Sequence, residues 1–395
     1  GFFMTDIKKR AQALNPQIVE WRRHFHQNPE TGLDTPLTEA FIVERLREMG
    51  IDEIRMGVGR HGVTALIRGG KPGKVLGIRA DIDALPVKED TGLPFAATNN
   101  RMHACGHDAH VAILLGTAKI LVENRKDLPG TIKLIFQPSE ETSEGAPAMI
   151  RDGVLEDPAM DAIIGLHTGN LWKGLSSGMV GYRYGVLMAA TDWFTVTFEG
   201  KGGHGATPHL TVDPIAMACQ AFSAIQMIVS RETSPLSPAV ITVGKIYGGT
   251  ALNVIAPTCT ISGTIRSLDP ETRAMLSERL KTVCDGIARS MRGRADVQMT
   301  FGTPALINDR EITDRLRKAA VDIMGEEAVA EVPEPTMGGE DMAYFLEKVP
   351  GSFFFLPSMY GGGKDYPHHH PKFDLDEEVF WIGSAVMAHF AMTWQ

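Results

Sequence analysis

A chain of 395 residues is longer than a single compact domain usually is, so two domains are expected. Its 43% hydrophobic and 22% charged residues, without low-complexity tracts or repeats, indicate a globular protein and exclude a disordered chain or a solenoid. The net charge is -9, and basic and acidic residues are mixed along the chain, so no positive electrostatic field is expected that would attract nucleic acid or anionic lipid. Small molecules are therefore the expected partners.

The start of the chain and its apolar runs predict a cytoplasmic protein. Gly1, Phe2 and Phe3 precede Met4, the expected natural start, and no leader with a cleavage site follows. The longest apolar run, around residues 111–122, contains Lys119 and is too short to span a membrane. The cysteines are too sparse for a disulfide scaffold, so reduced thiols are expected at Cys105, Cys219, Cys259 and Cys284.

The first half of the chain predicts an α/β domain. Thr35 as N-cap and Pro36 at the first helical position start an amphipathic helix that Gly50 closes. Short apolar runs predict strands at 61–69, 74–80, 131–138 and 161–167, with a helix at 110–124 between two of them. Strands that alternate with helices indicate a sheet covered on both faces, which collects ligands at the carboxyl ends of its strands.

Polar side chains follow these strands at the expected ligand edge. The second strand runs into Asp81 and Asp83, the third into Glu140 and Glu141, and the fourth ends in His167. Neighbouring residues in extended chain point to opposite sides, so one glutamate could bind a metal while the other takes a proton from water. The alternative for the glutamate pair is a solvated acidic turn.

From about Thr191 the pattern changes to a second domain. Alternating strands at 191–200, 239–249, 258–268 and 295–302, with helices at 213–232 and 270–292, give the order β-α-β-β-α-β. Asp213 is the expected cap of the first of these helices. We therefore predict a ferredoxin-like domain at 186–303, inserted into a catalytic domain formed by residues 4–185 and 304–395.

The segment RMHACGHDAH, at 101–110, carries metal-seeking side chains. In an extended loop Cys105 and His107 would face the same way, and a thiolate with an imidazole suits zinc and its transition-metal neighbours. A lone Cys-x-His can also arise by chance. Asp108 is expected as a helix N-cap, and His103 and His110 in outer or structural roles.

Further candidates lie in loops and in the inserted domain. One histidine of the run at 368–370 could close a metal site. His204 lies in a glycine-rich loop, Asn253 follows GGTAL, and Arg266 ends a strand, where its guanidinium could grip a carboxylate. The alternatives are an exposed loop histidine and an exposed strand charge.

Together these segments resemble the two-metal amidohydrolases of the aminoacylase and carboxypeptidase superfamily, in the branch of hippurate hydrolase and the indole-acetyl-amino-acid hydrolases. The matching signatures run in family order from about residue 20 to 376 and are RRHFHQNPETG, RADIDALP, MHACGHDAH, FQPSEE, GLH, GGHGATPH, GGTALNVI, GTIR, MGGEDMAYF and HHPKFD. The chain departs at Asp81, where carboxypeptidase relatives carry histidine, and at Gly205, where many relatives carry alanine.

The resemblance implies a mixed-sheet metal-binding catalytic domain, an inserted lid and dimerisation domain, and two divalent ions. The implied ligands are Cys105, His107, Glu141, His167 and His369. Glu140 is the implied general base for a water that bridges the ions, and Asp83 the implied residue that orients the site. The implied metal is zinc, with manganese, nickel or cobalt as alternatives.

The resemblance also implies a substrate class and a partner. His204 would stabilise the oxyanion, commonly in the partner subunit of a homodimer joined through the inserted domain, while Asn253 and Arg266 would hold the substrate carboxylate. A tetramer is the alternative assembly. The expected activity is hydrolysis of N-acyl amino acids, with a dipeptidase or carboxypeptidase activity as the alternative. A noncatalytic protein with structural zinc would have four closing ligands and no spare carboxylate.

Overall fold

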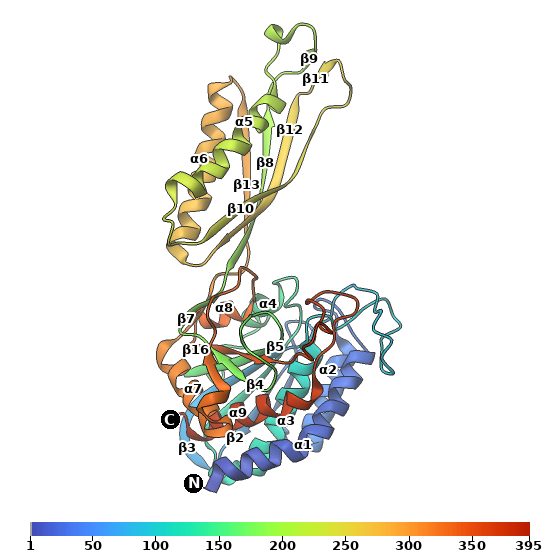
Figure 1. The fold of residues 1–395 in the computed structure, drawn as a ribbon, viewed down its shortest axis with the longest axis vertical. Coiled ribbons are helices and arrows are strands. Elements are labelled where there is room, and N and C mark those ends of the chain that lie inside the picture. The colour runs from blue at the N-terminus through green and yellow to red at the C-terminus, as the bar shows by residue number, and fades with distance from the viewer. Residues whose placement is uncertain (1) are drawn as a thin grey trace. The chain divides into compact units, whose positions relative to one another are not determined.

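The computed structural model describes residues 2–395, with side chains from Asp6 onward, and divides into two compact units (Figure 1). Gly1 lies outside the described residues. The first unit contains the chain up to Leu187 together with Ile307–Thr336 and Glu340–Gln395. The second contains Met188–Leu306 and the short return Met337–Gly339. The chain therefore leaves the first unit, builds the second and comes back.

The first unit is built on an eight-stranded mixed sheet. In sheet order its strands are β1 (Ile54–Val58), β2 (Gly62–Arg68), β4 (Pro129–Gln137), β3 (Lys71–Asp81), β5 (Ala162–Gly169), β16 (Gly351–Pro357), β6 (Val180–Tyr182) and β15 (Val329–Glu331). The central strands β4, β3, β5 and β16 are parallel, with Asp81 paired to Gln137 at one end. Their carboxyl ends therefore share one edge, and the predicted α/β class with a mixed sheet is confirmed.

Helices cover both faces of this sheet. One face carries α3 (His107–Glu123), α7 (Arg310–Met324) and α9 (Phe380–Thr393), with α1 (Phe2–Gln27) packed on α3 and α9 (Figure 1). Leu76, Ile78 and Ala80 of β3 belong to the core on that side. Arg79, which points the opposite way, bonds to Asp341 beside α8 (Met342–Leu346), and α4 (Gly145–Arg151) packs on β4.

Of the two helices at the start of the chain, one was predicted from its sequence and the other was not. The predicted helix at Pro36 is confirmed as α2 (Pro36–Glu48), but Thr35 makes no capping bond. Glu30 caps it instead, because its carboxylate accepts the backbone N–H groups of Leu37 at 3.1 Å and Thr38 at 2.6 Å. Helix α1 was not predicted from the sequence. Within residues 2–395, no helix combines the length and apolar character needed to cross a bilayer.

The second unit has the predicted β-α-β-β-α-β order. Its antiparallel sheet runs β10 (Ala239–Gly248), β12 (Thr258–Ser267), β8 (Ala190–Glu199) and β13 (Arg294–Phe301), with α5 (Pro214–Met227) and α6 (Pro270–Ser290) packed on it. Asp213 caps α5 as expected, accepting the N–H of Ile215 at 3.0 Å. A small two-stranded antiparallel sheet pairs β9 (Gly203–His204) with β11 (Val254–Ile255). Strands β7 (Gly185–Met188) and β14 (Leu306–Asn308), which lie mostly in the first unit, form another two-stranded sheet.

Candidate metal centre

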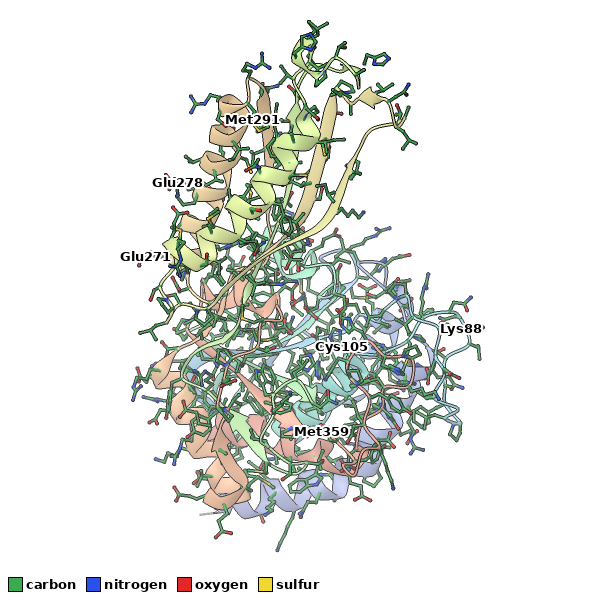
Figure 2. All side chains as sticks on the ribbon, turned by 45° about the horizontal axis from the view of Figure 1, so that its top comes forward. Lys88, Cys105, Glu271, Glu278, Met291 and Met359 are labelled. Carbon is green, nitrogen blue, oxygen red and sulfur yellow. The ribbon has the colours of Figure 1, made fainter. Side chains whose placement is uncertain are left out.

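The five predicted metal ligands converge at the carboxyl edge of the parallel strands. Among the groups of three potential ligand atoms that lie within 4.8 Å of one another, two contain Cys105. One set is Cys105, His107 and His167, and the other is Cys105, Glu141 and His369. Cys105, labelled in Figure 2, is buried, with 8% of its surface exposed. A single thiol shared by two ligand sets is an arrangement that can hold two ions.

In the first set, hydrogen bonds aim the imidazole lone pairs at the centre. His107 Nδ1 donates to the Asp83 carbonyl oxygen at 2.8 Å, so in the neutral ring the free lone pair lies on Nε2. His167 Nδ1 donates to the Thr168 carbonyl at 2.7 Å, and its Nε2 lies 3.8 Å from Cys105 Sγ. Both rings are therefore fixed in the tautomer that a metal ligand needs.

The second set closes the centre from two loops. Glu141 follows β4, and the Asp83 carboxylate accepts its backbone N–H at 3.0 Å. His369 follows β16, has a φ of 73°, and lies with Nε2 3.3 Å from Glu141 Oε2. Its own N–H donates to the Ala104 carbonyl at 2.7 Å, which joins this loop to the segment of Cys105. Asp83 thus orients residues of both ligand sets.

Glu140 belongs to neither Cys105-centred set, although its carboxylate also forms a group of potential ligand atoms with His107 and Glu141. Its carboxylate is 3.4 Å from His107 Nε2, and only 8% of the residue is exposed. Burial raises the pKa of Glu140 well above its ordinary value, and Glu340 and Glu141 raise it further. A carboxyl group with this surrounding has a strong tendency to hold a proton.

The chemistry of the cluster fits divalent metal ions. His107 Nε2, Asp81 Oδ2 and Glu141 Oε1 are buried without a hydrogen-bond partner among the residues that the structure describes. Burial and the Glu141 carboxylate raise the pKa of the Cys105 thiol, a cost that a bound cation reverses by stabilising the thiolate. Sulfur, nitrogen and oxygen ligands together suit zinc and its transition-metal neighbours.

Two histidines of the segment 101–110 lie outside the ligand sets. His110 Nε2 accepts the backbone N–H of Thr168 at 2.9 Å, so its Nδ1 donates to Asp81. Asp81, at the end of β3, also lies 3.2 Å from His107 Nε2. Both ring nitrogens of His103 are buried without a hydrogen-bond partner in the described part of the chain.

The expectation that Asp108 is a helix N-cap is wrong. Helix α3 begins at His107 and its N-cap position is Gly106, in the left-handed conformation with φ of 82°. Asp108 lies in the first turn, completely buried, and accepts hydrogen bonds from Arg22 and His26, each at 2.8 Å. The carboxylate turns toward these α1 side chains because they supply the cationic partners that a buried charge requires.

A buried network behind Glu140 was not predicted from the sequence. Arg79 donates to Glu340 at 3.0 Å and to Asp341 at 2.8 Å, and its Nε donates to Gln137 at 2.8 Å. Glu340 in turn groups with Asp81 and Glu140. The sequence signal for this network is the clustering of charged residues in RADIDALP and MGGEDMAYF, close to apolar strands. Such a cluster indicates buried ion pairs.

The three candidates of the second unit occupy two places in it. His204 is exposed on the two-stranded β9–β11 sheet, opposite Val254 in the strand register. Gly205 N–H donates to the Asn253 carbonyl at 2.8 Å, so the structure brings His204 and Asn253 together. Arg266 lies half-buried in β12, in the four-stranded sheet.

Comparison with known proteins agrees with this fold. The family model "Peptidase family M20/M25/M40" matches residues 77–393. The chain belongs to this family. The sequence-based prediction of a two-metal, metal-dependent amidohydrolase family is thereby confirmed.

Individual relatives agree over nearly the whole chain. The N-acetyl-L-cysteine deacetylase of Bacillus subtilis (strain 168) is 45% identical over 367 residues, which cover 92% of this chain and 85% of that protein. The IAA-amino acid hydrolase ILR1-like 2 of Arabidopsis thaliana is 37% identical and covers 96% and 86%. The crystal structure of the Bacillus subtilis YXEP protein, a dinuclear metal-binding M20 peptidase, aligns with a TM-score of 0.84 at 34% identity and covers 96% and 98%.

Proposed function

We propose that this M20-family member hydrolyses the amide bond of N-acyl amino acids, with Glu140 as the general base. The observation that carries the proposal is the position of Glu140, a buried carboxylate 3.4 Å from His107 Nε2 that belongs to neither Cys105-centred set. A structural metal site needs no such group. The similarity to a deacetylase of N-acetyl-L-cysteine supports the substrate class.

The proposed ligands are Cys105, His107, Glu141, His167 and His369, with zinc as the first candidate and manganese, nickel and cobalt as the others. When bound, two such ions supply a Lewis acid for the amide carbonyl and lower the pKa of the attacking water. Glu140 accepts the proton of that water and returns it to the leaving amine. Asp83 keeps His107 and Glu141 in place through the bonds described above.

The second unit supplies the proposed substrate contacts. Arg266 and Asn253 bind the carboxylate of the amino acid, since a guanidinium fork and an amide match its two oxygens. His204 donates to the oxyanion that develops on the attacked carbonyl. His204 is exposed, and its Nδ1 accepts the backbone N–H of Ala206 at 3.0 Å, which leaves Nε2 as the nitrogen that can donate to a ligand.

A substrate panel tests the proposed activity. The metal-reconstituted protein should release acetate, benzoate or indole-acetate from acylated amino acids faster than it cleaves dipeptides with a free amino terminus. Initial rates at equal substrate concentration decide this. Faster cleavage of dipeptides would instead favour the dipeptidase or carboxypeptidase function.

Replacing Arg266 with glutamine should raise KM for N-acyl amino acids about 10- to 100-fold, because a hydrogen-bonded charge contributes about 1.5–3 kcal/mol. The matched control is the corresponding N-acyl amino acid amide, which has no carboxylate to lose contact with. Steady-state kinetics of both substrates should show a large effect for the acid and little for the amide. An equal effect on the two would remove Arg266 from carboxylate binding.

His204 is proposed to serve the active site of the partner subunit in a homodimer joined through the second unit. Exposed apolar side chains near the β9–β11 sheet, at Leu210, Leu252 and Val254, favour a covered surface there. A His204→Ala chain mixed with a Glu140→Gln chain should then regain about a quarter of wild-type activity, as statistical mixing gives one intact site in half of the dimers. Mixed dimers without rescue would place the complete site within one chain.

A further inference from the structure

Arg22 is a buried arginine of α1 that binds three carboxylates at once. Its Nε donates to Asp108 at 2.8 Å, one terminal nitrogen to Asp374 at 3.2 Å and the other to Glu377 at 3.1 Å. The Arg22 side chain is 1% exposed and its bond to Asp108 is fully buried, whereas Asp374 and Glu377 are partly exposed. The three nitrogens of the guanidinium therefore hold two segments of the chain, one at Asp108 and one at residues 374–377.

These carboxylates lie in the chain segments that carry a ligand of each set. Asp108 directly follows the ligand His107 at the start of α3. Asp374 and Glu377 belong to the segment that follows the ligand His369. Arg22, which lies outside the metal centre, thus links the segment that carries His107 to the segment that carries His369.

We propose that Arg22 is a positioning residue for metal binding, which holds the His107 segment and the His369 segment at the separation that two ions require. The inference rests on the proposed metal centre. It adds Arg22, which is too distant in the sequence from the ligands to be recognised as part of that centre. Neighbours that orient ligands typically change metal affinity about 10- to 100-fold.

The contacts around Arg22 explain why the effect should be partial. His26 also holds Asp108, by the same oxygen at 2.8 Å, and binds Glu89 at 2.9 Å through its other nitrogen. The bond from His369 N–H to the Ala104 carbonyl remains whatever occupies position 22. The segments would therefore stay in contact without Arg22, but their separation would be less well fixed.

Lysine is the informative replacement for Arg22. It keeps a positive charge beside the buried Asp108, whose charge would otherwise be uncompensated and strongly destabilising. Its single ammonium group cannot reproduce the three-way geometry of the guanidinium. Arg22→Lys consequently separates positioning from charge balance.

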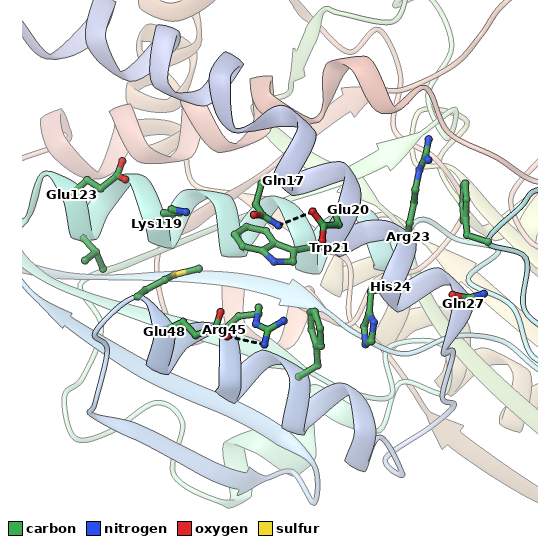
Figure 3. Close-up of a pocket in the computed structure, with 14 residues that line it drawn as sticks. Gln17, Glu20, Trp21, Arg23, His24, Gln27, Arg45, Glu48, Lys119 and Glu123 are labelled. Carbon is green, nitrogen blue, oxygen red and sulfur yellow. Dashed lines mark hydrogen bonds and ion pairs between the residues drawn. The ribbon is translucent and has the colours of Figure 1, made fainter.

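The chain offers two matched controls on the same helix. Arg10 binds Glu123 of α3 at 2.7 Å, which is another α1–α3 ion pair but exposed and distant in sequence from the ligands. Arg23 shares Glu377 with Arg22 at 2.7 Å, yet it is half exposed and lines an open hollow of about 740 Å³ between α1, α2 and α3 (Figure 3). Neither arginine binds Asp108.

The test is the affinity of the metal-free protein for Zn²⁺, measured by competition with a chromophoric chelator, together with the visible spectrum of bound Co²⁺. We expect Arg22→Lys to bind Zn²⁺ about 10- to 100-fold more weakly than wild type and to show an altered Co²⁺ spectrum, while Arg10→Lys and Arg23→Lys match wild type. Thermal unfolding of the metal-free variants reports their folding independently.

Each result has a distinct meaning. Wild-type protein that binds no Zn²⁺ would refute the proposed metal centre itself. Folded Arg22→Lys with wild-type affinity and spectrum would refute the positioning role alone. If Arg22→Lys does not fold, Glu377→Ala decides, since it removes one of the three carboxylates: weaker Zn²⁺ binding than in Arg23→Lys supports the proposal, and equal binding overturns it.

Discussion

Glu140→Gln should reduce kcat for N-acyl amino acids by about 100- to 10,000-fold, the contribution expected of a general acid–base residue. Glutamine has nearly the same shape but cannot accept the proton of the attacking water. Because Glu140 belongs to neither Cys105-centred ligand set, the variant should still bind two metal ions. Steady-state kinetics and elemental analysis of the same preparation measure both quantities.

Glu144→Gln is the matched control for this change. It makes the same substitution four residues later, at an exposed position whose side chain makes no capping bond to α4. Its kcat should equal that of wild type. Substantial activity in metal-loaded Glu140→Gln would remove Glu140 from the role of base, whereas loss of the ions would identify it as a ligand.

Removing the Cys105 thiol should have the largest effect on metal binding. Cys105 is the residue that the two ligand sets share, so Cys105→Ala takes one ligand from each. The loss in affinity for both ions should exceed the about 10- to 100-fold that follows loss of an outer partner. Competition with a chelator on the metal-free protein measures it, and activity should fall to background at micromolar metal.

Cys219→Ala is the control, since Cys219 is an exposed thiol of α5 in the second unit. Its metal affinity should be unchanged. If Cys105→Ala loses affinity for one ion and keeps the other at wild-type strength, the two ions do not share the thiol. If it keeps both, Cys105 is only a buried core residue.

Much of the fold is readable from local patterns because its elements carry their own signals. The strands that end at Asp81 and Gln137 are short apolar runs, and Asp213 marks the start of α5. Helix α1 escaped prediction because it contains Pro16 and buries polar side chains, Arg22 and His26, that a hydrophobic pattern does not count. Their partners lie more than 60 residues away in the chain.

The candidate site, too, was predictable only in part from the sequence. Parallel strands bring their carboxyl ends together, so Glu141 and His167 could be expected near one another from the sequence alone. That Cys105 belongs to both ligand sets became visible only in the structure. The tautomers of His107 and His167 depend on hydrogen bonds to backbone carbonyls, which no sequence motif encodes. Asp108 was misassigned for the same reason, because its partner Arg22 becomes a neighbour only when α1 packs on α3.

The central claim is that Cys105, His107, Glu141, His167 and His369 hold two divalent ions while Glu140 stays unligated. Anomalous diffraction at the zinc edge, from crystals of the zinc-loaded protein, tests it most directly. We predict two peaks per chain, both in contact with the Cys105 sulfur, and a Glu140 carboxylate that binds neither ion. A single peak, peaks away from Cys105, or Glu140 bound directly to an ion would contradict it.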